Sequence, residues 1–348
     1  MRVFLLVSSA LALALTGCGS GSEGGKAADA QNATRFAIER IALPGDGRGD
    51  FITVDAPRDL LFVTHSSKVH ILDLASLKQR AEVDGLKATH GVAMDNQSGH
   101  AFVTDGERDA VIMFDPARGR TLKTISAGKK PDSILLDPAS QKLFAFNGES
   151  GDATVIDPSN GSVSGKVKLP SNPESVQADG KGTIWVTMED ADAIAQIDSK
   201  AMKFVRSLPL PGCDGPAPLA LDQTNHLLFT GCGNKLMMVS DASSGQILTS
   251  VPIGGDPDGI IFDAARKRLF VANRDGAWTV IDQQARDRYS VNQSLKIDQY
   301  AKTAALDPAT HRIFSSTADL VWPKAIPGKK LLPNAKPGTF RLVVVKEL

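Results

Sequence analysis

The chain has 348 residues, of which 31 are glycine and 19 are proline, and only 5% are aromatic. This composition is typical of a turn-rich globular protein. Basic and acidic residues both number 39, so the formal net charge is zero. Proteins that bind nucleic acids or anionic membranes through surface charge normally carry a basic surplus, so we expect neither kind of contact.

The N-terminus has the pattern of a secretion signal. Arg2 gives it a positive start, residues 4–15 are apolar, and the tetrapeptide Leu-Thr-Gly-Cys ends at Cys18. The tetrapeptide resembles the bacterial lipobox, which implies removal of residues 1–17 and attachment of acyl chains to Cys18.

A short polar stretch separates this signal from the rest of the chain. Residues 18–33 contain no periodic apolar pattern, so we expect a flexible tether. Gly19 follows the cysteine. By similarity with Gram-negative lipoproteins, this residue implies lipid anchoring in the outer membrane of the cell envelope, facing the periplasm.

The remaining residues, 34–348, contain seven segments that share one pattern. An apolar strand ends at an aspartate, and a second strand of the type Leu-Phe-Val-Thr follows after a turn. Aspartates cap tight turns by bonding the nearby backbone, so we interpret them as turn formers rather than as catalytic groups. They recur every 40 to 44 residues, as Asp55, Asp95, Asp137, Asp179, Asp222, Asp263 and Asp307.

Each segment also has a third strand pattern, and six have a fourth, such as TLKTISAG at 121–128. Four strands at this period are typical of propeller blades. The seventh segment ends without a fourth strand, but residues 36–43 have the outer-strand pattern. Because an incomplete blade would expose a strand edge, we expect residues 36–43 to complete it. The sequence therefore predicts an all-β fold, a seven-bladed β-propeller with four-stranded blades over 34–348.

The second strands resemble the motif of the YVTN, or YncE-like, β-propeller family, most clearly at 62–65 (FVTH), 102–105 (FVTD) and 270–273 (FVAN). The resemblance covers residues 34–348. The family is united by fold rather than by one activity, so the resemblance implies an architecture and not a function. Asparagine commonly closes the motif in that family, and this chain keeps it at Asn147 and Asn273.

The first strands of a propeller surround a central channel, and their N-terminal ends meet at one mouth of it. The residues five positions before each repeated aspartate should therefore form a ring. They are Asp50, His90, Asp132, Glu174, Ala217, Asp258 and Lys302. The ends of the second strands should form a wider ring on the same face, including His65, Asp105, Asn147 and Asn273.

These side chains allow three interpretations. They could hold a hard cation such as Ca²⁺ through carboxylate and amide oxygens, bind a polar ligand through mixed charges, or simply be solvated. Because no short metal-ligand motif accompanies the ring, we expect no required cofactor, with Ca²⁺ as the alternative. Some small-molecule or protein contact on this face is expected.

Blade seven contains a long insertion, residues 318–339, between its second and third strands. Loops of this length are commonly functional or disordered. The insertion should emerge on the same face as the ring, where Trp322 could contact a ligand or partner. A lid or docking arm and a passive loop remain equal alternatives.

Two cysteines remain in the predicted propeller. Cys213 precedes the first strand of blade five and Cys232 ends the second, so antiparallel pairing brings them to the same end. In an oxidising compartment we expect a disulfide, with two free thiols as the alternative. A redox site is not expected without CxxC spacing.

Together these features predict a monomeric, lipid-anchored binding module of the cell envelope, with no catalytic residue assigned. Its channel mouth and the 318–339 loop would bind a small polar ligand or an envelope protein. A metal-dependent lactonase-type hydrolase is the alternative, with His90 as base. Its metal ligands would be Asp50, Asp132, Glu174 and Asp258, although Lys302 argues against a highly charged metal ion. The sequence lacks the C-x-x-C-H motif of haem attachment and the G-x-S-x-G motif of serine hydrolases.

Overall fold

The computed structural model describes residues 34–324 and 332–348. The predicted signal peptide (1–17) and the tether (18–33), with the lipidation site Cys18, lie outside these residues. No helix in the described ranges has the length and apolar character needed to cross a membrane. The helices described there are the single 3₁₀ turns η1 (Ala56–Arg58), η2 (Gly106–Arg108) and η3 (Glu189–Ala191).

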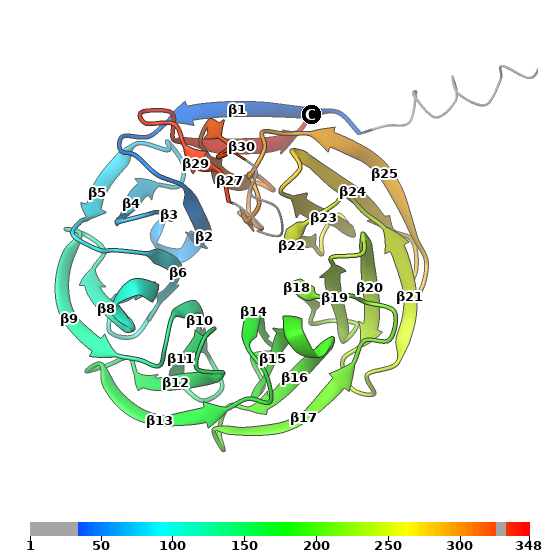
Figure 1. Ribbon diagram of the computed structural model, residues 1–348, viewed down its shortest axis with the longest axis horizontal. Coiled ribbons are helices and arrows are strands. Elements are labelled where there is room, and N and C mark those ends of the chain that lie inside the picture. Colours follow the sequence, from blue (N-terminus) through cyan, green and yellow to red (C-terminus); the bar gives the residue numbers. More distant parts are fainter. Residues whose placement is uncertain (1–33, 325–331) are drawn as a thin grey trace, which may run out of the picture. The chain divides into compact units, whose positions relative to one another are not determined.

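Most described strands belong to seven antiparallel, four-stranded sheets arranged in a ring (Figure 1). This arrangement confirms the predicted seven-bladed β-propeller. In each blade the strand nearest the channel comes first. Blade one contains β2 (Gly49–Asp55), β3 (Leu60–His65), β4 (Lys68–Asp73) and β5 (Gln79–Val83); blade two contains β6 (Thr89–Met94), β7 (Ala101–Asp105), β8 (Ala110–Asp115) and β9 (Arg120–Ser126); blade three contains β10 (Pro131–Asp137), β11 (Lys142–Asn147), β12 (Asp152–Asp157) and β13 (Ser162–Lys168).

The next three blades repeat this order without a change of topology. Blade four contains β14 (Pro173–Ala178), β15 (Thr183–Met188), β16 (Ala193–Asp198) and β17 (Lys203–Pro209); blade five contains β18 (Pro216–Asp222), β19 (Leu227–Cys232), β20 (Leu236–Asp241) and β21 (Ile247–Pro252); blade six contains β22 (Pro257–Asp263), β23 (Arg268–Asn273), β24 (Ala277–Gln283) and β25 (Tyr289–Lys296).

Blade seven combines the two ends of the propeller. It contains β26 (Ala304–Leu306), β27 (Ile313–Thr317), β30 (Arg341–Glu347) and, as its outer strand, β1 (Phe36–Ala42). β1 pairs antiparallel with β30 from Phe36 opposite Glu347 to Ala42 opposite Arg341, as predicted. The insertion adds a two-stranded ribbon of β28 (Leu320–Val321) and β29 (Asn334–Ala335).

Six of the seven repeated aspartates accept backbone N–H bonds within their turns, which confirms their interpretation; Asp55 instead contacts the Arg58 side chain at 3.2 Å. Asp179 accepts backbone N–H bonds from Lys181, Gly182 and Thr183 at 2.7, 3.1 and 2.9 Å. Asp222 accepts two such bonds at 3.0 Å each. The carboxylates thus satisfy the backbone donors of the turn between the first and second strands.

The core of the described propeller lies between its blades rather than at its centre. Seven clusters of buried apolar side chains fill the spaces between neighbouring sheets. The cluster between blades seven and one contains Leu43, Val63, Phe314 and Phe340. Because this packing closes the circle, the inner strands are held at fixed positions around the channel.

Cys213 and Cys232 are joined by a disulfide, with a Cα–Cα distance of 5.2 Å. Both residues are buried at the interface between blades four and five. The bond ties the segment that enters blade five to the end of its second strand.

Candidate functional site

The predicted inner ring occupies the start of the inner strands. Six of its residues are the second residue of β2, β6, β10, β14, β18 and β22, and Lys302 lies two residues before β26. In each of the six strands, pairing with the second strand is irregular at this position; in β10, for example, it breaks between Pro131 and Ile134. Irregularities of this kind redirect side chains, here toward the channel.

Hydroxyl groups fix the backbone at these irregular positions. Thr104 donates to the carbonyl oxygen of Asp132 at 2.6 Å, and Ser133 donates to that of Glu174 at 2.7 Å. Thr187 donates to the carbonyl oxygen of Ala217 at 2.7 Å. Each bond links one blade to the next, so the ring is held by the scaffold rather than by flexible loops.

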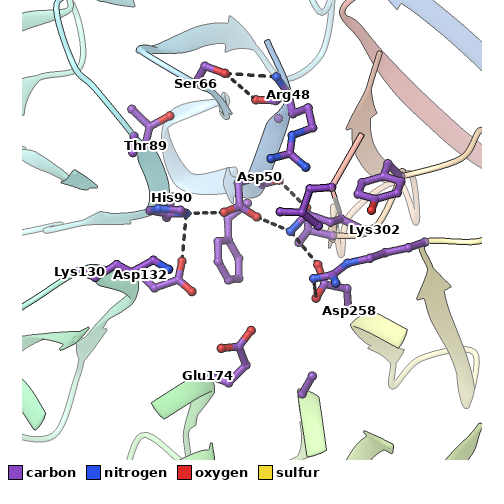
Figure 2. A pocket seen from close by; sticks show the side chains of 18 of the residues that line it. Arg48, Asp50, Ser66, Thr89, His90, Lys130, Asp132, Glu174, Asp258 and Lys302 are labelled. Carbon is purple, nitrogen blue, oxygen red and sulfur yellow. Dashed lines mark hydrogen bonds and ion pairs between the residues drawn. The ribbon is translucent and has the colours of Figure 1, made fainter. Parts of the chain in front are cut away.

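A polar cavity of about 500 Å³ opens at this mouth of the channel, and all seven ring positions line it (Figure 2). A ligand pocket of this volume suits a small molecule. A second, smaller cavity of about 180 Å³ is lined by apolar residues such as Val92 and Ile260 together with polar ones such as Ser133 and Gln177. Phe51 lines both cavities, so the two cavities adjoin.

On one side of the ring, charged side chains are bound to one another. Lys302 Nζ lies 2.7 Å from a carboxylate oxygen of Asp50 and 2.7 Å from one of Asp258. Arg274 contacts the other oxygen of Asp258 at 2.6 Å. Burial alone would lower the pKa of Lys302, but the charges of Asp258 and Asp50 outweigh burial and raise it.

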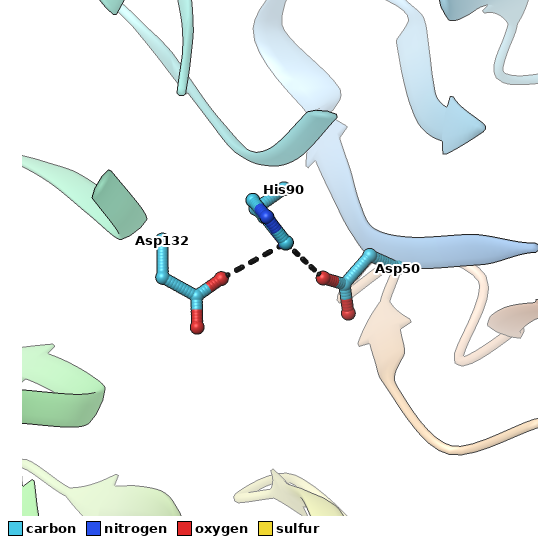
Figure 3. Close-up of side chains that lie close together, drawn as sticks. All are labelled: Asp50, His90 and Asp132. Atoms are coloured by element: carbon cyan, nitrogen blue, oxygen red, sulfur yellow. Dashed lines mark hydrogen bonds and ion pairs between the residues drawn. The ribbon is translucent and has the colours of Figure 1, made fainter. Parts of the chain in front are cut away.

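His90 extends this network (Figure 3). Its Nδ1 lies 2.5 Å from an oxygen of Asp50 and 3.1 Å from one of Asp132. Burial opposes a positive charge on His90, but the hydrogen bond with Asp50 and the charge of Asp132 outweigh it and raise its pKa to about 9. Burial also opposes the negative charge of Asp50, yet the Lys302 charge and the His90 bond hold the pKa of Asp50 well below its usual value.

The other side of the ring is different. No hydrogen bond or ion pair joins the Glu174 side chain to another described residue, and Figure 2 shows it apart from the bonded groups. Burial, reinforced by the negative charges of Asp132 and Asp258, raises the pKa of Glu174 to about 8. The next ring position is Ala217, whose methyl group leaves space beside Glu174.

The predicted wider ring does not line this cavity, so that part of the site prediction needs correction. His65, Asp105, Asn147 and Asn273 are all fully buried within the blades. Asn147 and Asn273 donate hydrogen bonds within their own blades, whereas Asp105 holds the segment that enters blade two. Asp105 accepts the backbone N–H groups of Lys87 and Ala88 at 3.0 Å each.

Close packing explains why these side chains are covered. A Cβ atom at Gly128 would approach Asn147 Nδ2 to 2.6 Å, and one at Gly254 would approach Asn273 Nδ2 to 2.6 Å. Glycine lets each entering segment lie directly on the amide. His65 instead stacks on Phe340, with ring centroids 3.6 Å apart. The second-strand ends are therefore structural.

Two residues of the insertion, Leu332 and Trp322, lie at or beside the mouth of the cavity. Leu332 lines the cavity. Trp322 is 55% exposed, and its ring contacts Tyr300, another lining residue, edge to face at 6.0 Å. Trp322 therefore stands beside the cavity rather than in its wall. Residues 325–331 lie outside the described part.

Several lining residues were not predicted from the sequence. Arg274 directly follows Asn273 at the end of a second strand, and Phe51 follows the ring residue Asp50. Arg48 and Tyr300 lie two residues before ring positions. These residues could have been predicted from their positions in the sequence, because each lies within two residues of a ring position or of a second-strand end.

The described residues therefore form a seven-bladed β-propeller with a mixed-charge cavity at one mouth of its channel. No family model matches the chain. No curated protein matches it in sequence. Among solved structures, a chain of the hydrazine synthase of Kuenenia stuttgartiensis is similar, with 15% identity, coverage of 78% of this chain and 92% of that chain, and a TM-score of 0.68. At this identity the similarity supports the propeller fold alone, a scaffold that serves both binding proteins and enzymes.

Proposed function

We propose that this chain is a binding module that holds a small polar ligand in the cavity at the channel mouth. The carrying observation is that this cavity of about 500 Å³ collects charged side chains from six blades. Their positions are fixed by the scaffold, so little ordering is needed on binding.

We further propose that the chain is a cell-envelope lipoprotein of the YVTN-like propeller class. The lipobox-like sequence ending at Cys18 and the repeated second-strand motif support this proposal. In this proposal, two or more acyl chains on Cys18 anchor the mature chain stably. Incorporation of a labelled fatty acid in bacterial cells tests the anchor. We expect labelling of the wild-type chain and none of a Cys18→Ala variant, whereas equal labelling would refute lipidation at this residue.

Native mass spectrometry tests the binding function. The purified chain is incubated with a defined mixture of polar metabolites, and retained compounds are identified by mass. We expect at least one to be retained and then lost in an Ala217→Trp variant, because the indole would occupy the part of the cavity beside Glu174. Glu149→Gln is the matched control, since Glu149 is exposed and does not line the cavity. Retention that is unaffected by Ala217→Trp would place binding elsewhere.

A metal-dependent, lactonase-type hydrolase is the second candidate. One observation favours it: ligand atoms of Asp50, His90 and Asp132 lie within 4.8 Å of one another. The ammonium of Lys302, 2.7 Å from Asp50, counts against it because it already compensates that carboxylate. Elemental mass spectrometry of protein purified without chelator separates the candidates. One metal ion per chain, lost on Asp132→Ala, would favour the hydrolase.

A further inference from the structure

The residues of the inner ring differ in the ion pairs that they form with other side chains. Asp50 and Asp258 are each engaged by Lys302, and His90 and Arg274 extend the bonded group. Blades six, seven, one and two therefore present acids that are each paired with cations. Across blades three to five the ring instead presents Asp132, Glu174 and Ala217. We call this second set the open arc.

The open arc presents two acids: Asp132 shares His90 with Asp50, and Glu174 has no ion pair among the described residues. Asp132 contacts His90 through one oxygen, at 3.1 Å, but Asp50 lies closer to the same nitrogen at 2.5 Å. That oxygen of Asp132 is buried and makes no hydrogen bond within the described structure. Glu174 has neither an ion pair nor a hydrogen bond to a described side chain, and Figure 2 shows its carboxyl group directed into the cavity. The methyl group of Ala217 leaves the adjacent position unfilled.

We propose that the open arc binds the protonated primary amine of a small organic ligand, with Glu174 and Asp132 as its acceptors. This inference rests on the proposed binding function and names the ligand class. An ammonium group carries three N–H donors and no acceptor, which matches an arc of carboxyl oxygens. An anionic ligand would oppose the ionisation of both acids, whereas an ammonium group favours their carboxylate forms.

The backbone of the arc favours an amine over a metal ion. A hard cation such as Ca²⁺ requires six to eight oxygen ligands. The carbonyl oxygens of Asp132, Glu174 and Ala217 already accept bonds from Thr104, Ser133 and Thr187. The two carboxyl groups that remain suit an ammonium donor set better than a full metal coordination shell. The raised pKa of Glu174, caused mainly by burial, is consistent with a carboxyl group that lacks its cation.

Three four-carbon compounds that differ in their end groups test the inference: putrescine, 1,4-butanediol and succinate. Calorimetric titration of the purified chain should give binding of putrescine alone. Glu174→Gln keeps the shape of the side chain and should weaken binding about 10- to 100-fold, the range for a lost charge-assisted hydrogen bond. The control Glu149→Gln should leave the affinity within about twofold, because that exposed residue lies outside the cavity.

Ala217→Lys provides an independent variant that adds rather than removes a group. Its ammonium would reach the open arc, pair with Glu174 and take the place of the ligand amine. We expect loss of putrescine binding together with a higher midpoint of thermal unfolding, which a misfolded variant would not show. Putrescine binding that survives both Glu174→Gln and Ala217→Lys would overturn the inference.

The remaining outcomes distinguish this inference from the proposed function. Binding of butanediol or succinate at least as tight as that of putrescine, and abolished by Ala217→Trp, would overturn the amine assignment and support the cavity as a binding site. If none of the three compounds binds up to millimolar concentration, the amine assignment fails. The metabolite mixture then decides separately whether the cavity binds anything.

Discussion

Lys302 Nζ lies 2.7 Å from a carboxylate oxygen of Asp50, although the two residues are 252 positions apart. The pair connects the inner strand of blade one to the segment that enters blade seven. The same contact therefore joins blades seven and one and fixes two charged side chains in the cavity wall.

Lys302→Met should destabilise the protein because Asp50 and Asp258, whose side chains are 17% and 8% exposed, would lose the cation that they share and keep only His90 and Arg274 as partners. We expect the free energy of unfolding at pH 7 to fall by about 3 kcal/mol, as for removal of one partner of a buried ion pair. The loss should shrink as the pH falls from about 4, the pKa of an aspartate in the unfolded chain, toward the lowered pKa of Asp50 in the folded protein. Denaturant titration measures both effects, with the exposed Lys296→Met as control. Equal losses in the two variants would contradict the assigned role.

His90 should titrate well above an ordinary histidine, because Asp50 and Asp132 raise its pKa to about 9. The unfolded value is about 6.5. Its contribution to stability is therefore complete below pH 6.5 and is lost as the pH rises through 9. Imidazole chemical shifts in labelled protein measure the midpoint. A midpoint below 6.5 would contradict this electrostatic account and favour a metal ion, which binds neutral imidazole.

The Cys213–Cys232 disulfide closes a loop with a sequence separation of 19 residues. Constraining a loop of this length in the unfolded chain is worth about 3 kcal/mol. The double variant Cys213→Ala, Cys232→Ala should lose about that amount, measured by chemical unfolding. A reducing agent should destabilise the wild-type chain but leave the variant unchanged. Insensitivity of both proteins would mean that the bond does not form in solution.

Binding of an amine at the open arc should release a proton near neutral pH. Glu174 has a pKa of about 8 and is therefore mainly protonated at pH 7. An ammonium beside it favours the carboxylate, so affinity should rise as the pH increases toward 8. Calorimetry with putrescine in two buffers of different ionisation enthalpy counts the released protons. If the binding enthalpy measured at pH 7 is the same in both buffers, Glu174 does not ionise on binding.

The architecture and the inner ring could be predicted from the sequence because both follow from one repeated aspartate. Asp179 and Asp222 end their turns by bonding the backbone, which fixes where the inner strands stop. Counting back five residues from each aspartate then reaches a position at or just before the start of the inner strand. The closing role of residues 36–42 followed from the missing outer strand.

The remainder of the site depends on contacts that no repeat encodes. His65 and Asn147 occupy equivalent strand ends, but whether such a side chain faces solvent depends on the entering segment that packs over it. The spacing also places Asp50 and Glu174 at equivalent positions. The spacing does not reveal that Lys302 forms an ion pair with Asp50, or that no described side chain pairs with Glu174. Pairing across a ring depends on the lengths and directions of side chains from distant blades.

The most direct test of the central claim is a crystal structure of the chain with the compound that binds most tightly among the metabolite mixture and putrescine. The account predicts that this compound lies in the cavity of about 500 Å³ at the channel mouth, with its amine at Glu174 and Asp132. A compound bound on the outer strands or between blades, with the cavity unoccupied by it, would contradict the account.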